Sequence, residues 1–275
     1  MATLKESLIG KLPEKELLLV PSSFDIVGDL AIFSEFPKEL KKKEKLIGET
    51  LLGMHRNLKV VLKKIGTYRG KFRTPKLKVI AGENRKETMH VEHGCRLRVN
   101  PEKAYFSARL GGERKRIASQ VKKNESVLVL FSGIGVYPIV IARIAQPQEI
   151  VSVELNPFAV KYHQENLRLN KVFHISLIKG DVRKVLPRLK KKFDRIVMPL
   201  PKGGEKFLKD ALQCSKKGTI VHFYTFSRED EMGKLGKTIM EMCKKTKVNV
   251  KILQVVPCGH FGPGIIRVCV DFQRV

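Results

Sequence analysis

Residues 126–135 read SVLVLFSGIG, a run of valine and leucine that ends in two closely spaced glycines. An apolar run of this kind is typical of a buried strand, and glycines let the chain turn sharply where the strand ends. Glycine also lets a ligand approach the main chain, so Gly133 and Gly135 mark a candidate binding turn. Two glycines alone are weak support, and a tight turn without a ligand stays the alternative at this point.

The pattern of a strand followed by a helix continues toward the C-terminus. We expect strands in EIVSVELN at 149–156, in ISLIKGD at 175–181 and in DRIVMPLP at 194–201, with helices between them. This alternation predicts an α/β domain with a doubly wound, mostly parallel sheet, which we place at residues 101–275. The last segment, VCVDFQRV at 268–275, is expected to be the final strand.

The first 100 residues have a different pattern. A basic, helical lead-in comes first, and an amphipathic helix is expected at 38–55. Short segments with strand character occur at 22–36, 58–66, 77–82 and 90–100, separated by turns. This arrangement predicts a smaller α+β domain at residues 1–100 that precedes the α/β domain.

Charge is the strongest signal in the composition. The chain of 275 residues has 54 Lys and Arg against 27 Asp and Glu, a net charge of +27. A field of this sign attracts polyanions, so we expect a nucleic-acid partner. A solvated lysine-rich surface is the alternative, but such surfaces usually balance lysine with glutamate.

Several classes of protein are excluded by the same reading. No stretch approaches the ~18 uninterrupted apolar residues of a membrane-spanning helix, and the N-terminal segment has no apolar core of a secretory signal. The five cysteines are widely spaced, form no C-x-x-C pair and are odd in number. We therefore expect neither a disulfide framework nor a zinc site, and a cytoplasmic protein with no bound metal and no membrane contact.

Acidic residues end the next two strands of the predicted sheet. Glu154 lies 21 residues after Gly133, where a carboxylate can accept both hydroxyls of a ribose. Asp181 ends the following strand at the same carboxyl edge, within reach of an adenine amino group. A dinucleotide fingerprint requires a third glycine where this chain has Pro138. The pattern therefore favours S-adenosylmethionine over a nicotinamide dinucleotide.

The order of the remaining motifs is highly specific. They are YFSARLGGER at 105–114, VLVLFSGIG at 127–135, VELNP at 153–157, GDVR at 180–183, MPLP at 198–201 and GPGIIRVCVDF at 262–272. Together with FDIVGDLAI at 24–32 and GKFRTPKLKVIAG at 70–82, they resemble the archaeal and eukaryotic tRNA (guanine(37)-N1)-methyltransferases over roughly residues 20–275. The resemblance implies a Rossmann-like methyltransferase sheet, and a monomer that methylates N1 of guanosine 37 in the tRNA anticodon stem-loop with S-adenosylmethionine. The extra N-terminal domain of many members is expected to be absent.

The resemblance also implies roles for individual residues. Glu113 would be the general base that removes the N1 proton, because protonated N1 is a poor nucleophile. Arg73 would stabilise negative charge on guanine O6, while Tyr105 and Arg109 would shape the pocket for the target base. Pro199 stands where relatives often have asparagine, and its carbonyl could accept a hydrogen bond from the guanine amino group. The residues implied to bind the cofactor are Arg109, Phe131, Gly133, Gly135, Glu154, Leu155, Asp181, Val182 and Pro199.

Each of these assignments has an alternative. Glu113 could be only an ion-pair partner within a basic helix, Arg73 could contact phosphate, and Tyr105 could be a packed interdomain aromatic. The nearest alternative function is a wybutosine-pathway transferase of the same fold, which transfers an aminocarboxypropyl group or methylates a wyosine intermediate. Arg109 and Glu113 favour the guanine methyltransferase. A nicotinamide dehydrogenase and a non-catalytic RNA-binding module are more distant alternatives.

Overall fold

The computed structural model describes residues 2–70, 72 and 74–275. The chain divides into two compact units, one of Met1–Glu92 and Arg96–Ala108 and the other of His93–Cys95 and Arg109–Val275. The predicted boundary at residue 100 stays a prediction.

The first unit is built on a four-stranded sheet in the order β1-β2-β3-β4. β2 and β3 are parallel, and the other neighbours are antiparallel. Its helix α2 buries Ile47 and Leu51 against strand residues such as Val61, because these two side chains lie one turn apart on one face. The elements are η1 (Glu6–Leu8), α1 (Glu14–Leu19), β1 (Asp25–Val27), β2 (Leu30–Phe33), η2 (Lys38–Lys43), α2 (Glu44–Met54), β3 (Val60–Arg69) and β4 (Thr74–Gly82).

A two-stranded sheet of β5 (Thr88–Glu92) and β6 (Cys95–Val99) follows in the chain. The predicted α+β content of this N-terminal region is confirmed, with a helix at Glu44–Met54 inside the expected range 38–55.

The second unit contains a seven-stranded sheet in the order β12-β13-β11-β10-β7-β8-β9. The five adjacent strands β11, β10, β7, β8 and β9 are parallel to one another, and β13 is antiparallel to both β11 and β12. Its strands are β7 (Ser126–Leu130), β8 (Glu149–Glu154), β9 (Ile175–Lys179), β10 (Phe193–Met198), β11 (Ser215–Arg228), β12 (Val250–Gly262) and β13 (Ile265–Arg274). The predicted doubly wound, mostly parallel sheet is confirmed.

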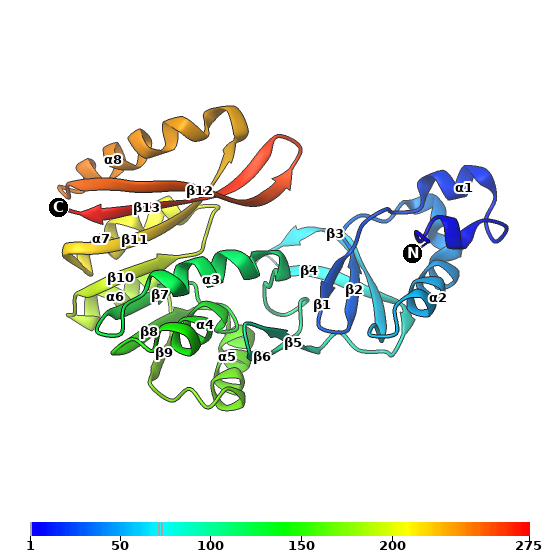
Figure 1. Ribbon diagram of the computed structural model, residues 1–275, viewed down its shortest axis with the longest axis horizontal. Coiled ribbons are helices and arrows are strands. Elements are labelled where there is room, and N and C mark those ends of the chain that lie inside the picture. Colours follow the sequence, from blue (N-terminus) through cyan, green and yellow to red (C-terminus); the bar gives the residue numbers. More distant parts are fainter. Residues whose placement is uncertain (1, 71, 73) are drawn as a thin grey trace. The chain divides into compact units, whose positions relative to one another are not determined.

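Helices cover both faces of this sheet (Figure 1). α6, α7 and α8 contribute Leu186, Leu212 and Ile239 to one apolar core with strand residues such as Ile196, while α3 packs on α4 at the other face. The helices and short turns of the unit are η3 (Ala108–Leu110), α3 (Gly111–Gln120), α4 (Val136–Ala145), α5 (Pro157–Leu169), α6 (Val182–Leu189), η4 (Gly204–Phe207), α7 (Leu208–Gln213), η5 (Glu229–Lys234) and α8 (Leu235–Lys245).

The strand order indicates which edge of the sheet can bind a ligand. From β7 the chain moves outward through β8 to β9 and then returns to the other side of β7 as β10. In such sheets, ligands bind beyond the carboxyl ends of the strands at the point where the order reverses. Here that point lies between β7 and β10, so the segments beginning at Phe131 and Pro199 flank it.

Two sequence expectations concern features outside this edge. Within the described residues, no helix combines the length and the apolar character needed to cross a membrane. All five cysteines are free, and four of them are buried. Burial raises the pKa of Cys243 to about 12, consistent with an inert core thiol.

Candidate functional site

The glycine turn after β7 has the backbone geometry that its sequence predicts. Phe131, Gly133 and Gly135 have φ angles of 53°, 57° and 90°, in the left-handed region that favours glycine. The Gly135 amide donates to the Ser132 carbonyl at 3.0 Å and closes the turn before α4 begins. Gly133 is partly exposed while Gly135 is buried, so a cofactor can approach the main chain of this turn at Gly133.

A buried histidine supports this turn from α5. His163 is fully buried, and its Nδ1 lies 3.4 Å from the Ser132 hydroxyl. A Cβ atom added to Gly135 would lie 2.6 Å from His163 Nε2, so the imidazole occupies the space that a side chain would need. Burial lowers the pKa of His163 to about 3, which keeps the ring neutral at ordinary pH. The need for glycine at this position comes from a residue that sequence motifs did not point to.

Glu154 lies at the carboxyl end of β8, as predicted, and is tied to the glycine turn. Its carboxylate accepts hydrogen bonds from the amides of Gly133 at 2.6 Å, Leu155 at 2.8 Å and Asn156 at 2.7 Å. Burial raises its pKa in spite of these three amide donors. Oε1 already accepts two of these amides and Oε2 accepts one, so one acceptor position on Oε2 remains for a ribose hydroxyl.

Asp181 caps α6 and lies near the predicted residue Phe131 through Arg183 and Phe207, which the sequence did not single out. Its carboxylate accepts a bond from the Arg183 amide at 3.0 Å and pairs with the Arg183 guanidinium at 2.9 Å. The Arg183 guanidinium lies 5.4 Å from the centre of the Phe207 ring, and Phe207 contacts Phe131 edge-on at 5.0 Å. Phe131, Phe207 and Asp181 thus supply apolar faces and an acceptor suited to an adenine. No local motif marks Phe207, since only the fold brings it to Phe131.

The other residues predicted to bind the cofactor, Pro199, Leu155 and Val182, differ in burial and in local structure. Pro199 follows β10 and sits in a sharp turn, in which the Leu200 amide donates to the Met198 carbonyl at 2.8 Å. Leu155 is partly buried directly after β8. Val182 begins α6, but its side chain is buried in the apolar core at 3% exposure, so only its main chain can face a ligand.

The residues predicted to surround the target base fall in different parts of the chain. Tyr105 belongs to the first unit, where its side chain is 44% exposed. Arg109 belongs to the second unit and is exposed on η3, directly before α3. Arg73 lies outside the described residues, so its predicted contact with guanine O6 stays a prediction.

Glu113 lies in the first turn of α3 and is buried at 8% exposure. Its two carboxylate oxygens accept hydrogen bonds from Nε and Nη2 of Arg116 at 2.7 and 2.8 Å, and the Tyr224 hydroxyl donates to Oε1 at 2.6 Å. Tyr224 in turn accepts a hydrogen bond from Tyr137, the second residue of α4, at 3.0 Å. Two hydrogen bonds therefore connect Glu113 to the helix that starts at the glycine turn. The intrahelical ion pair considered as an alternative does form, but it accompanies a contact from β11.

One group of described residues could offer three ligand atoms to a metal ion. The side chains of His222, Cys269 and Asp271 are buried, with their ligand atoms within 4.8 Å of one another. Arg116 and Arg195 donate to this group at 2.6 and 2.7 Å, so two cations already occupy its acceptors. Electrostatic repulsion by two guanidinium groups opposes a third cation there, and we interpret the group as a hydrogen-bond network.

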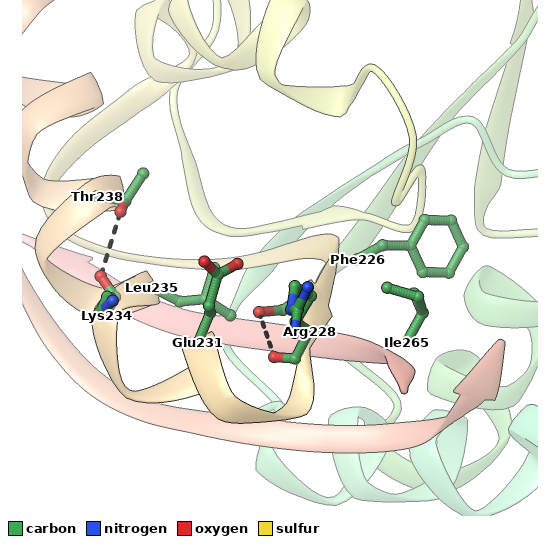
Figure 2. Close-up of a pocket in the computed structure, with 8 residues that line it drawn as sticks. Phe226, Arg228, Glu231, Lys234, Leu235, Thr238 and Ile265 are labelled. Atoms are coloured by element: carbon green, nitrogen blue, oxygen red, sulfur yellow. Dashed lines mark hydrogen bonds between the residues drawn. The ribbon is translucent and has the colours of Figure 1, made fainter. Parts of the chain in front are cut away.

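A surface pocket of about 450 Å³ lies between η5, α8 and the adjoining ends of β11 and β13 (Figure 2). Phe226 and Ile265 form an apolar side, while Arg228, Glu231 and Lys234 bring charges of both signs. The pocket contains none of the residues predicted for the cofactor or the target base. We therefore assign the candidate site to the strand ends after β7, β8, β9 and β10.

The comparisons with known proteins identify the family of the chain. Residues 88–251 match the model of the TRM5/TYW2 methyltransferase domain, and residues 4–85 match that of the TYW2 N-terminal domain. The tRNA (guanine(37)-N(1))-methyltransferase Trm5b of Pyrococcus abyssi is 37% identical over 96% of this chain and 78% of its own length.

Two solved structures extend the likeness to the fold. A structure of aTrm5 in complex with tRNALeu has a TM-score of 0.86 and 32% identity, and it covers 99% of this chain and 78% of that one. A structure of Methanocaldococcus jannaschii TYW2 with AdoMet has a TM-score of 0.68 and 25% identity, covering 92% of this chain and 100% of that one. The domain match alone spans more than half of the 275 residues. The chain therefore belongs to the TRM5/TYW2 methyltransferase family.

Proposed function

We propose that this protein is a tRNA (guanine(37)-N1)-methyltransferase that transfers the methyl group of S-adenosylmethionine to N1 of guanosine 37. Its family, and the name of a relative that is 37% identical over 96% of the chain, support this proposal. The observation that carries it is Glu113, a buried carboxylate linked through Tyr224 and Tyr137 to the helix of the glycine turn. Methylation of N1 requires a base that removes the N1 proton, and a carboxylate can serve as that base.

The chain supplies the groups that the cofactor requires. Glu154 keeps one acceptor position on Oε2 for a ribose hydroxyl, and Phe131 with Phe207 offers apolar faces for adenine. S-adenosylmethionine, when bound, supplies an activated methyl group, because its sulfonium leaves as a neutral thioether. No further activation of the methyl group is required of the protein.

The protein has to activate the nucleophile instead. Guanine N1 carries a proton at neutral pH, and its nucleophilicity rises as the N1–H bond breaks. In the proposed reaction Glu113 takes this proton while the N1–CH₃ bond forms, and charge that develops on O6 is stabilised by a cationic side chain. Arg73 is our prediction for that cation, and Arg109 is exposed on η3, directly before the helix that carries Glu113.

The charge of the chain supports a polyanionic substrate. With +27 overall, and with runs such as Lys41–Lys43 in η2 and Lys190–Lys192 before β10, the protein should attract tRNA over long distances. We predict that these lysine runs raise the affinity for tRNA, and that the candidate site selects guanine N1 as the atom that is methylated.

Nucleoside mass spectrometry tests the proposal. Unmodified tRNA is incubated with the protein and isotope-labelled S-adenosylmethionine, then digested, and the labelled nucleoside is identified. We expect 1-methylguanosine at position 37, and Glu113→Gln should lower the single-turnover rate by about 10²–10⁴ while both ligands still bind. Substituting guanosine 37 in the tRNA serves as the control and should abolish labelling.

The wybutosine-pathway alternative has a different product in the same assay. Its support is the match of residues 4–85 to the TYW2 N-terminal domain and the likeness to a TYW2 structure. An aminocarboxypropyl group on the nucleoside, or labelling only of a tRNA that already carries a wyosine intermediate, would replace our proposal with this one.

A further inference from the structure

Arg116 is shared between two buried carboxylates. It lies one turn after Glu113 on α3 and binds both oxygens of that residue. Its other edge binds Asp271 of β13, with Nη1 at 2.6 Å from Oδ2 and Nη2 at 3.4 Å from Oδ1. A planar guanidinium suits this bridging role, because its donors form a rigid fork.

Asp271 is held as a carboxylate by groups from three strands. It accepts from His222 Nδ1 at 2.6 Å, Gln254 Nε2 at 2.6 Å and Cys269 Sγ at 3.1 Å. Burial by itself would raise the pKa of Asp271, but the hydrogen bonds from His222 and Arg116 outweigh it and hold the pKa far below its usual value. Asp271 is thus a permanent negative charge beside Arg116.

The orientation of His222 follows from its other neighbour. Arg195 Nη1 lies 2.7 Å from His222 Nε2. A guanidinium can only donate, so Nε2 is the acceptor and Nδ1 carries the proton given to Asp271. Burial lowers the pKa of His222, which favours this neutral ring. Arg195 is itself balanced by Glu125, with contacts of 2.6 and 3.0 Å.

The balance of charge in this cluster matters for proton uptake. Before reaction, Glu113 and Asp271 carry two negative charges against the one positive charge of Arg116. Once Glu113 is protonated, Arg116 still has Asp271 as a counter-charge. The Arg116 side chain is 23% exposed, and a partly buried guanidinium left without a partner would be destabilising. The second carboxylate therefore lowers the electrostatic cost of protonating Glu113. Within the described residues, the titratable and charged groups around Glu113 include Arg114 and Arg116 on α3, Tyr137 on α4, Tyr224 on β11, Cys258 on β12, and Cys269 and Asp271 on β13.

We propose that Arg116 is a positioning residue for methyl transfer, with Asp271 as its reserve counter-charge. Arg116 orients the unprotonated carboxylate of Glu113, and Asp271 remains as the counter-charge of the guanidinium when Glu113 accepts the N1 proton. This inference rests on the proposed function, in which Glu113 is the general base.

A double-mutant cycle tests the proposal in the full-length protein. Single-turnover methylation, tRNA affinity and cofactor affinity are measured for the wild type and for Arg116→Gln, Glu113→Gln and their combination. We expect Arg116→Gln to lower the rate about 100-fold, the loss typical of a misplaced catalytic group, with both affinities within about twofold. The double variant should be no slower than Glu113→Gln alone, because Arg116 acts through Glu113.

A second readout separates positioning from a purely structural role. Removing the cation in Arg116→Gln should move the acid limb of the pH–rate profile to higher pH, and removing the reserve charge in Asp271→Asn should move it to lower pH. Arg116→Lys should restore part of the rate. Arg85→Gln is a matched control, because Arg85 forms a comparable ion pair with Asp29 in the first unit and should change neither the rate nor the profile.

The outcomes are distinguishable. The role of Arg116 would be overturned if the rate losses of the two single variants multiplied in the double variant. It would also be overturned if the acid limbs of the Arg116→Gln and Asp271→Asn profiles moved in the same direction or did not move. A wild-type protein that makes no 1-methylguanosine would overturn the proposed function itself, and an unimpaired Glu113→Gln would overturn both the base assignment and this inference.

Discussion

Substituting Gly135 with alanine should damage the cofactor turn through one identifiable collision. The new Cβ would lie 2.6 Å from His163 Nε2, about 0.8 Å closer than the 3.4 Å at which ordinary contacts begin. His163 is fully buried and cannot swing into solvent. Alanine would also have to adopt a φ of 90°. We expect about 1–2 kcal/mol from the left-handed backbone and about 1–3 kcal/mol from overpacking.

Gly218 offers a matched control for this prediction. It has the same φ of 90°, but an added Cβ there meets no atom within 4 Å. Gly218→Ala should therefore lose only the backbone contribution of about 1–2 kcal/mol, while Gly135→Ala should lose about 2–5 kcal/mol. Urea unfolding measures both free energies, and calorimetry with S-adenosylmethionine should show weaker binding for Gly135→Ala alone.

Trimming the histidine completes the design. In the double variant Gly135→Ala with His163→Ala, the collision is removed, so the second substitution should be less destabilising than His163→Ala is in the wild type. Equal losses for the alanine variants at Gly135 and Gly218, or full additivity with His163→Ala, would refute the claim that the imidazole dictates glycine at this position.

Three further predictions follow from the same structure. His163 has a pKa of about 3 in the folded state against an ordinary value of 6.5. Its stabilising contribution is therefore complete above pH 6.5 and falls by about 1.4 kcal/mol per pH unit as the pH drops toward 3; relative to the wild type, His163→Gln should be less destabilising at pH 4 than at pH 7 in urea titrations. Phe207→Ala should weaken S-adenosylmethionine binding about 10-fold, on the scale of a lost aromatic contact, whereas the 79% exposed Phe173 provides a control alanine variant whose calorimetric affinity should be unchanged. The logarithm of the tRNA association constant, measured by filter binding, should fall linearly with the logarithm of the salt concentration. Neutralising Lys41–Lys43 should make this slope less steep, and an unaltered slope would contradict the prediction.

Much of the fold was predictable because its signals are local. Strand-length apolar runs, helices between them and glycines at a strand exit indicated a doubly wound sheet, and the structure confirms it with β7, β8, β9 and β10 at the expected segments. The carboxyl ends of parallel strands meet at one edge by geometry. For that reason the sequence could place Gly133, Glu154 and Asp181 at a common edge without any knowledge of tertiary contacts.

Side-chain partners from distant segments were a different matter. The sequence suggested an intrahelical pair for Glu113, and Arg116 supplies it. Nothing in the sequence indicated that Arg116 also reaches Asp271, which lies 155 residues away. That contact depends on how α3 packs on the sheet and on the register that sets His222 opposite Asp271.

The sequence by itself determined the sheet, its binding edge and the family resemblance, because periodicity and strand-end residues act over a few positions of the chain. Only the tertiary structure decided that His163 fills the space beside Gly135 and that Glu113 shares its guanidinium with Asp271. Such pairings arise from packing between elements far apart in the chain, where a shift of one residue in a strand exchanges the buried and exposed faces.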